Sequence, residues 1–221
     1  MIVKICGITT LGDALTCIEA GADWLGFNFY PPSPRYLTPT NCVEITAALR
    51  RSHPKIKLVG VFVDAPIQEV TAILDGCRLH MAQLCGHEPP EHLAKLGERA
   101  FKALRPTDAA ALEADLATYP ARDEAPAWLI DAYRPGQYGG TGHTADWSLA
   151  AGLARRAPIL LAGGLKPGNV AQAVAQVRPW GVDVASGVES APGRKDAALV
   201  RAFVQEARSA LFPLPLRERE G

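Results

Sequence analysis

The sequence lacks an excess of charge of either sign. Its 221 residues include 23 lysines and arginines and 23 aspartates and glutamates, so the formal net charge at pH 7 is zero. Non-specific nucleic-acid binding relies on a basic surface that attracts the phosphate backbone. The composition therefore argues against a nucleic-acid partner.

The sequence also lacks a hydrophobic run of the length needed to cross a bilayer, which is about 20 consecutive apolar residues. No charged segment followed by an apolar, cleavable segment precedes the first short apolar run at residues 2–6. We therefore expect a cytoplasmic protein that makes no membrane contact.

Cysteine is scarce, and its spacing is irregular. The five cysteines are an odd number, contain no Cys-x-x-Cys pair and have no cluster of histidines beside them. Disulfide frameworks and zinc sites both need more regular patterns. We expect free thiols in a reducing compartment.

What the sequence does contain is a regular alternation of two kinds of segment. Short apolar runs typical of strands alternate with alanine-rich stretches of helical spacing. The predicted strands are 2–6, 24–29, 56–63, 79–84, 100–104, 128–130, 159–162 and 182–185. The predicted helices are 11–20, 41–50, 67–74, 91–96, 109–117, 147–154, 169–177 and 196–211.

This alternation predicts an α/β fold that is a single-domain (β/α)8 TIM barrel. The strand candidates are continuously apolar, as parallel strands covered on both faces are. Eight strand-and-helix units in a chain of this length suit a compact barrel over residues 1–211, followed by a flexible tail at 212–221. A doubly wound open sheet is the alternative, because periodicity does not reveal closure.

In such barrels the active site lies where the strands end, and this chain places polar side chains there. Cys6 ends the first strand and precedes a glycine turn. A cysteine taken alone is most often a packing residue, but one at the mouth of a barrel is placed to react. The other polar residues at or after strand ends are Asn28, Arg35, Asp64, Gln83, Asp131 and Ser186.

Three glycine turns follow the late strands. Without side chains, such turns bring backbone N–H groups close to an anion, and the loops after strands seven and eight often bind phosphate. The glycines could instead only permit tight turns, but their repetition favours a phosphate site. The candidate residues are Gly140, Thr141, Gly142, Gly163, Gly164, Ser186 and Gly187.

Two charged residues have plausible chemical roles. Arg35 follows a proline-rich, stiff loop, and its planar guanidinium suits a carboxylate, although a solvated surface arginine is nearly as good an interpretation. Asp131 follows an apolar strand, where partial desolvation allows a carboxyl group to act as a general acid. Aspartates after strands often only cap helices. Asp64 and Asp183 could both be structural.

Several segments together resemble the phosphoribosylanthranilate isomerase family of tryptophan biosynthesis. The resemblance extends over nearly the whole chain, and the joint order and spacing of the segments are highly specific. The segments are KICGIT at 4–9, GFNFY at 26–30, SPRY at 33–36, VGVFV at 59–63, GGTG at 139–142, LAGGL at 161–165 and GVDVASGVE at 181–189.

The resemblance implies a barrel without cofactor or metal that binds a small phosphorylated substrate. The implied reaction is the Amadori rearrangement of N-(5-phosphoribosyl)anthranilate to the corresponding 1-deoxyribulose 5-phosphate. By their matching positions, Cys6 is the general base, Asp131 the general acid, and Arg35 the contact to the anthranilate carboxylate. Gln83 and Asp183 match further substrate-site positions, and the glycine turns match the phosphate site. A free thiol has a pKa of about 8.5, so a positively charged neighbour of Cys6 would help it act as a base.

One departure from the family pattern is visible. The family typically has Gln-Leu-His-Gly where this chain has Gln83-Leu84-Cys85-Gly86, so a thiol replaces a histidine. Two alternatives remain: another phosphosugar aldose-ketose isomerase, or a catalytically silent barrel that binds a phosphorylated ligand. An enzyme with a two-phosphate substrate is disfavoured, because the loop at Asp64 is acidic and contains no glycine. The chain could be a monomer or a homodimer.

Overall fold

The structure is a computed structural model, and it describes residues 1–131 and 146–210. The predicted turn that contains Gly140, Thr141 and Gly142 and the predicted tail at 212–221 lie outside the described residues. Over the described part of the chain, no helix is long and apolar enough to cross a membrane.

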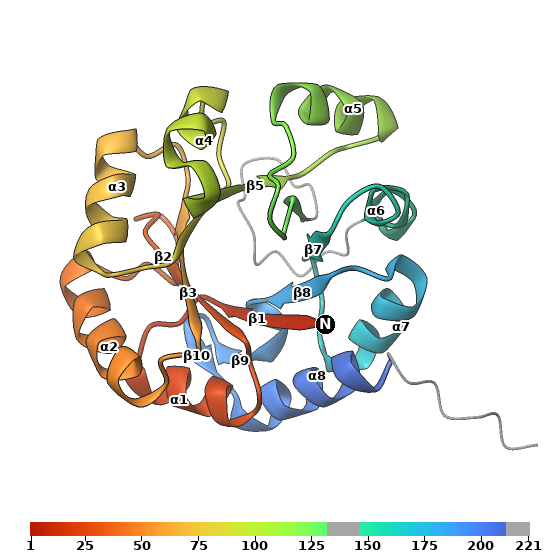
Figure 1. Ribbon diagram of the computed structural model, residues 1–221. Coiled ribbons are helices and arrows are strands. Elements are labelled where there is room, and N and C mark those ends of the chain that lie inside the picture. The colour runs from red at the N-terminus through yellow and green to blue at the C-terminus, as the bar shows by residue number, and fades with distance from the viewer. Residues whose placement is uncertain (132–145, 211–221) are drawn as a thin grey trace, which may run out of the picture.

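Within residues 1–131 and 146–210, eight parallel strands close into a barrel in sequence order, and β8 is hydrogen-bonded to β1 (Figure 1). Each run predicted as a strand overlaps one of them. This closure confirms the predicted TIM barrel and excludes the open sheet. The strands are β1 (Ile2–Cys6), β2 (Trp24–Asn28), β3 (Lys57–Phe62), β4 (Met81–Leu84), β5 (Ala100–Leu104), β6 (Trp128–Ile130), β7 (Ile159–Leu161) and β8 (Gly181–Val184).

The α-helices of the described segments form a ring around the barrel (Figure 1). Their bounds differ from the prediction mainly at the ends. For example, α2 begins two residues before the predicted start because Thr38 caps it and Pro39 occupies its first position. The helices are α1 (Leu11–Glu19), α2 (Pro39–Ser52), α3 (Ile67–Gly76), α4 (Pro90–Leu96), α5 (Ala109–Thr118), α6 (Trp147–Ala154), α7 (Pro167–Val177) and α8 (Ala197–Ser209).

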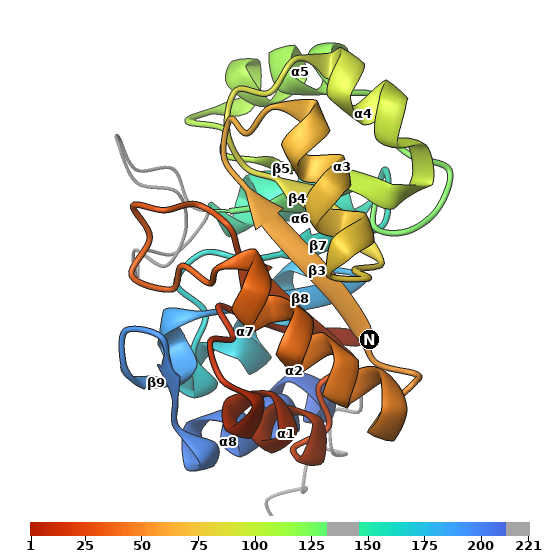
Figure 2. The same cartoon turned by 90° about the vertical axis from the view of Figure 1, so that its left-hand side faces the viewer.

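A short hairpin between β8 and α8 was not predicted. It consists of β9 (Glu189–Ala191) and β10 (Arg194–Lys195), which pair antiparallel after the one-turn 3-10 helix η2 (Ser186–Val188). Strands of two or three residues with polar side chains give no apolar run that periodicity could detect. Figure 2 shows β9 on the side of the barrel opposite the N-terminus, which is the side where the parallel strands end.

The apolar core has two parts. The larger cluster packs the outer faces of the strands against the helices. A smaller cluster is made almost entirely of strand residues and fills the barrel interior. Because successive residues of a strand face opposite sides, each strand supplies both clusters. The interior cluster includes Trp24, Val59, Met81, Phe101, Leu129 and Leu160.

A buried ion pair connects β5 to the loop after β4. The Lys102 Nζ atom lies 2.7 Å from Glu88 Oε2, and the two side chains are 3% and 1% exposed. Lys102 also donates a hydrogen bond of 2.6 Å to the carbonyl oxygen of Gly86. Phe101 and Ala103 belong to the interior cluster, so Lys102 lies on the outer face of β5. Burial raises the pKa of Glu88, but Lys102 and the hydrogen bonds from backbone N–H groups together lower it below its usual value.

We expect Lys102→Met to lower the free energy of unfolding by about 3–5 kcal/mol, because it leaves the Glu88 carboxylate buried without its cation. Urea denaturation measures this change. Arg99→Met is the matched control, since the Arg99–Asp75 ion pair is exposed and such pairs contribute little. An unchanged urea midpoint for Lys102→Met would contradict the expectation.

Candidate active site

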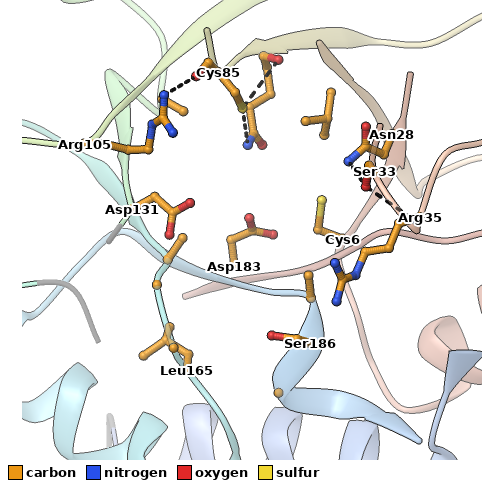
Figure 3. Close-up of a pocket in the computed structure, with 18 residues that line it drawn as sticks. Cys6, Asn28, Ser33, Arg35, Cys85, Arg105, Asp131, Leu165, Asp183 and Ser186 are labelled. Atoms are coloured by element: carbon orange, nitrogen blue, oxygen red, sulfur yellow. Dashed lines mark hydrogen bonds between the residues drawn. The ribbon is translucent and has the colours of Figure 1, made fainter. Parts of the chain in front are cut away.

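A pocket opens at the carboxyl ends of the barrel strands (Figure 3). Parallel strands converge there, so residues far apart in the sequence become neighbours. The pocket also receives Asn28, Cys85 and Arg105. Every described residue predicted for the site lines it: Cys6, Arg35, Gln83, Asp131, Gly163, Gly164, Asp183, Ser186 and Gly187.

Cys6 lies at the end of β1, and its side chain is near the pocket surface with 9% exposure. Gly26 on β2 pairs with it, and a Cβ at that glycine would lie 2.7 Å from the Cys6 Sγ atom. A side chain there would displace the thiol, so the sequence needs glycine at this position. Burial raises the pKa of the Cys6 thiol above its usual value, and the positive charge of Lys4 opposes this rise only in part.

Lys4 is a functional candidate that the sequence analysis missed. Its side chain is fully buried, and its Nζ atom donates a hydrogen bond of 2.8 Å to Asp183 Oδ1. Lys4 and Asp183 are register partners in the β1–β8 pair. Although burial lowers the pKa of Lys4, the Asp183 charge raises it above its usual value, so the amine stays charged. The sequence feature that could have identified Lys4 is its position two residues before Cys6, because this spacing puts both side chains on the same face of the strand.

Arg35 is held from two sides. Its Nε and Nη2 atoms donate hydrogen bonds of 2.9 Å and 2.7 Å to the two carboxylate oxygens of Glu189. Gly7, with a φ of +76°, leaves the space that the arginine stem occupies, since a Cβ there would lie 2.5 Å from Arg35 Cδ. Arg35 is 9% exposed. The interpretation as a solvated surface arginine is therefore wrong.

The β9–β10 hairpin supplies the groups that fix this corner of the site. Lys195 on β10 donates hydrogen bonds of 2.8 Å to Glu189 Oε1 and 2.6 Å to the carbonyl oxygen of Cys6. The hairpin thus ties the end of β1 to the Arg35 guanidinium through one buried carboxylate. Neither Glu189 nor Lys195 was predicted as a site residue, because the sequence alone does not show that the hairpin folds over the barrel mouth.

Gln83 and Cys85 form the opposite wall of the pocket. The Gln83 Nε2 atom donates a hydrogen bond of 3.2 Å to Cys85 Sγ. Gln83 Oε1 is buried without a hydrogen-bond partner among the described residues, so it is available as an acceptor inside the pocket. Arg105 donates a hydrogen bond of 3.0 Å to the carbonyl oxygen of Cys85. Burial raises the pKa of the Cys85 thiol to about 12, which keeps it protonated.

The glycine turns after β7 and β8 lie against each other. Gly163 and Gly164 have φ values of +86° and +62°, a region that favours glycine. A Cβ at Gly187 would overlap the backbone carbonyl oxygen of Leu165, so the two loops touch there. The Asn169 side chain accepts a hydrogen bond of 2.8 Å from the Lys166 N–H and donates one of 3.0 Å to the Gly164 carbonyl, which fixes the turn to the start of α7.

The aspartates differ in position. Figure 3 shows Asp131, at the end of β6, across the pocket from Cys6, with Asp183 between them. Asp64 does not line the pocket, and its carboxylate accepts a hydrogen bond from the backbone N–H of His87. Asp64 is thus structural, whereas Asp183 is part of the site. Among the described residues, no group of three or more His, Cys, Asp or Glu side chains is arranged to hold a metal ion.

The fold and the site define a class: a (β/α)8 barrel enzyme with an acid, a thiol and two touching glycine turns around one pocket. The family model for N-(5'-phosphoribosyl)anthranilate isomerase matches residues 3–206. Two relatives of that name, from Geobacter metallireducens and Geobacter sulfurreducens, are 47% and 49% identical. The alignments cover 94% and 93% of this chain and 98% of each relative. The chain belongs to the N-(5'-phosphoribosyl)anthranilate isomerase family.

Solved structures agree with this assignment. The phosphoribosyl anthranilate isomerase of Thermotoga maritima is 38% identical, with a TM-score of 0.84 over 95% of this chain and 100% of that chain. A second phosphoribosyl anthranilate isomerase structure, 37% identical with a TM-score of 0.80 and the same coverage, holds reduced 1-(o-carboxyphenylamino)-1-deoxyribulose 5-phosphate. The chain is therefore an isomerase of tryptophan biosynthesis that rearranges N-(5-phosphoribosyl)anthranilate. The two alternatives from the sequence, another phosphosugar isomerase and a catalytically silent barrel, are therefore not retained.

We expect Glu189→Gln to destabilise the protein by about 3 kcal/mol at neutral pH, because Arg35 and Lys195 lose their shared counter-charge. Burial raises the pKa of Glu189, but Arg35 and Lys195 together lower it below its usual 4.5. The carboxylate's stabilisation is therefore complete above about pH 4.5 and is lost as the pH falls through the lowered pKa.

Urea denaturation of the wild type and of Glu189→Gln, at neutral pH and at several pH values below 4.5, measures the effect. The difference in urea midpoint between the two proteins should become smaller as the pH falls. A difference that stays constant or grows as the pH falls would be inconsistent with this ion pair.

Proposed function

We propose that Cys6 is the general base and Asp131 the general acid of the isomerisation. The observation that supports this assignment is their placement on opposite sides of one pocket, at the ends of β1 and β6 (Figure 3). A substrate bound between them presents one face to the acid and the other to the base. Two groups on facing walls suit a reaction that needs one proton donated and one removed.

The rearrangement proceeds through two proton movements. Asp131 gives its proton to the furanose ring oxygen, the C1′–O bond breaks, and the nitrogen lone pair forms an iminium at C1′. The Cys6 thiolate then takes the C2′ proton, and the C2′–H electrons form an enamine as the iminium is neutralised. The enamine tautomerises to the aminoketose. The anthranilate nitrogen is the electron sink, so the steps balance without an external oxidant or reductant.

The substrate's two anionic ends are held at different places. Its phosphate binds the glycine turns that include Gly163, Gly164, Ser186 and Gly187, where backbone N–H groups and the N-terminus of α7 favour an anion. Its anthranilate carboxylate binds Arg35, whose guanidinium lies beside Cys6 in the pocket. The product analogue bound in one of the solved relatives carries the same two groups, a phosphate and a carboxyphenyl ring.

Two pocket residues orient the sugar. Gln83 Oε1 is a buried acceptor that a ribose hydroxyl can satisfy. Asp183 lies between the acid and the base, where the carboxylate oxygen that does not bind Lys4 accepts a hydrogen bond from a second hydroxyl. Cys85 at the family's histidine position stays a neutral thiol, so it contributes packing and a weak hydrogen bond rather than a charge.

The surroundings of the enzyme are also part of the proposal. The free, buried thiols suit the reducing cytoplasm. The protein acts as a monomer or a homodimer on a small phosphorylated substrate, without a nucleic-acid or membrane partner. Both assembly states occur among its structural relatives, since monomers have been generated from the dimeric Thermotoga maritima enzyme.

Replacing either proton-transfer group should lower kcat sharply. Cys6→Ser and Asp131→Asn are each expected to reduce kcat by about 10²–10⁴-fold while the barrel stays folded, because each removes one acid or base of suitable strength. The loss of phosphoribosylanthranilate fluorescence measures turnover, and circular dichroism checks the fold. Near-normal turnover by Cys6→Ala would show that the base is another group.

Gly187→Ala should weaken substrate binding. Its Cβ would overlap the Leu165 carbonyl, so the loops after β7 and β8 must separate and the phosphate site opens. We expect the KM for phosphoribosylanthranilate to rise about tenfold or more, because the loss of even one charge-assisted hydrogen bond costs about 1.5–3 kcal/mol. Gly76→Ala, at the end of α3 with open space around it, is the control and should leave KM unchanged. Equal KM values for the two variants would argue against a phosphate site here.

A further inference from the structure

We propose that Lys4 is a positioning residue that holds the Cys6 thiol and controls its ionisation. Lys4 lies two residues before Cys6 on β1, and both side chains enter the barrel interior. Its Nζ atom is close to the thiol, since a Cβ at Gly26 would lie 3.2 Å from Nζ and 2.7 Å from Sγ. The inference rests on the proposed role of Cys6 as the base.

The burial of Lys4 needs an explanation other than stability. Its side chain is fully inside the barrel, beside a cluster of buried apolar side chains. A buried ion pair contributes little net stability, because desolvation cancels much of the attraction. An apolar residue would fill the same volume at lower cost. The pair of Lys4 and Asp183 directly below a reactive thiol is therefore better explained by its effect on that thiol.

The charged groups around Cys6 come from several elements. On its own strand the neighbour is Lys4, and β8 contributes Asp183. On β10, Lys195 binds the Cys6 carbonyl oxygen, and the loop after β2 contributes Arg35, paired with Glu189. The facing residue of β2 is the uncharged Gly26, and Asp131 lies across the pocket on the β6 side.

Of the cations, Lys4 acts most directly on the sulfur atom. Lys195 donates hydrogen bonds to three oxygens, the carbonyls of Cys6 and Ala185 and the Glu189 carboxylate. Arg35 forms a bidentate pair with that same carboxylate. Lys4 instead binds Asp183 and lies beside the thiol, on the same side of Gly26. Its influence on the pKa of Cys6 is the largest of the charged groups, and Asp183 opposes it.

This arrangement predicts opposite effects for the two members of the ion pair. Lys4→Met removes the cation and should raise the pKa of Cys6. Asp183→Asn leaves Lys4 charged and facing the sulfur, so it should lower that pKa. An ion pair that only supported the fold would not shift the pKa of the thiol in opposite directions in the two variants. The directions of the two pKa shifts therefore distinguish a positioning role from a structural one.

The test is the pH dependence of Cys6 alkylation by iodoacetamide in the full chain, followed peptide by peptide by mass spectrometry. At a fixed pH below the midpoint, Lys4→Met should react about tenfold more slowly than the wild type and Asp183→Asn faster, since one pKa unit changes the thiolate fraction about tenfold. The limb of the pH profile of kcat/KM that reports the ionisation of Cys6 should move with the labelling midpoint.

A double variant keeps the proposal testable if a single variant fails to fold. Lys4→Met with Asp183→Asn leaves no unpaired charge in the barrel, and its midpoint should lie between the wild-type and Lys4→Met values. Lys102→Met is the matched control, because it removes the amine of another buried ion pair, on the outer face of β5. It should leave the Cys6 midpoint unchanged.

The possible outcomes separate the two proposals. Unchanged Cys6 midpoints in the variants, or shifts in the same direction for Lys4→Met and Asp183→Asn, would overturn the role of Lys4. Opposite shifts together with near-normal turnover by Cys6→Ala would leave Lys4 in control of the thiol and remove Cys6 as the base. The labelling measurement does not depend on catalysis, so the two failures are distinguishable.

Discussion

The hydrogen-bonded contact between β1 and β8 is the constraint on which the site depends. It closes the barrel and brings together strands separated by most of the chain, so that Lys4 binds Asp183 across 179 positions of sequence. The same closure carries the β9–β10 hairpin over the end of β1, where Lys195 binds the Cys6 carbonyl. An open sheet would contain the same strands and none of these contacts.

Near the β1–β8 contact, several charged side chains are buried in ion pairs. Glu189 binds two cations, Arg35 and Lys195. Asp183 binds Lys4 through one carboxylate oxygen and also lines the pocket. Each side chain is thereby restricted to one geometry before substrate arrives. Preorganised charges of this kind are effective in catalysis because they need not reorient during the reaction.

The sequence was sufficient to predict the fold and the outline of the site. Continuous apolar runs identify buried parallel strands, and the residues at their ends, such as Cys6 and Asp131, meet at one rim once the strands close. The positions of Gly163 and Gly187 followed from the same rule. These features depend on local pattern and on topology, and both can be read from a sequence.

What could not be predicted is which charges become partners. Lys4 lies within an apolar run, where the sequence shows only a single polar residue in a strand. Its partner Asp183 is near the other end of the chain. Glu189 and Lys195 belong to strands too short to give a periodic signal. The network Lys4–Asp183 and Arg35–Glu189–Lys195 exists only in the closed barrel. The strength of these ion pairs depends on the distances between residues far apart in the sequence and on their burial, and a local sequence pattern predicts neither.

The charge sum of the ion pairs beside Cys6 has a consequence for substrate affinity. Three cations, Lys4, Arg35 and Lys195, face two carboxylates, Asp183 and Glu189. With Cys6 as a thiol the group carries one positive charge, and with a thiolate it is neutral. An incoming anion is attracted more strongly by the protonated form, and its negative charge raises the proton affinity of the sulfur. In the proposed mode of binding, the substrate lies beside Cys6 and therefore makes its thiolate a stronger base.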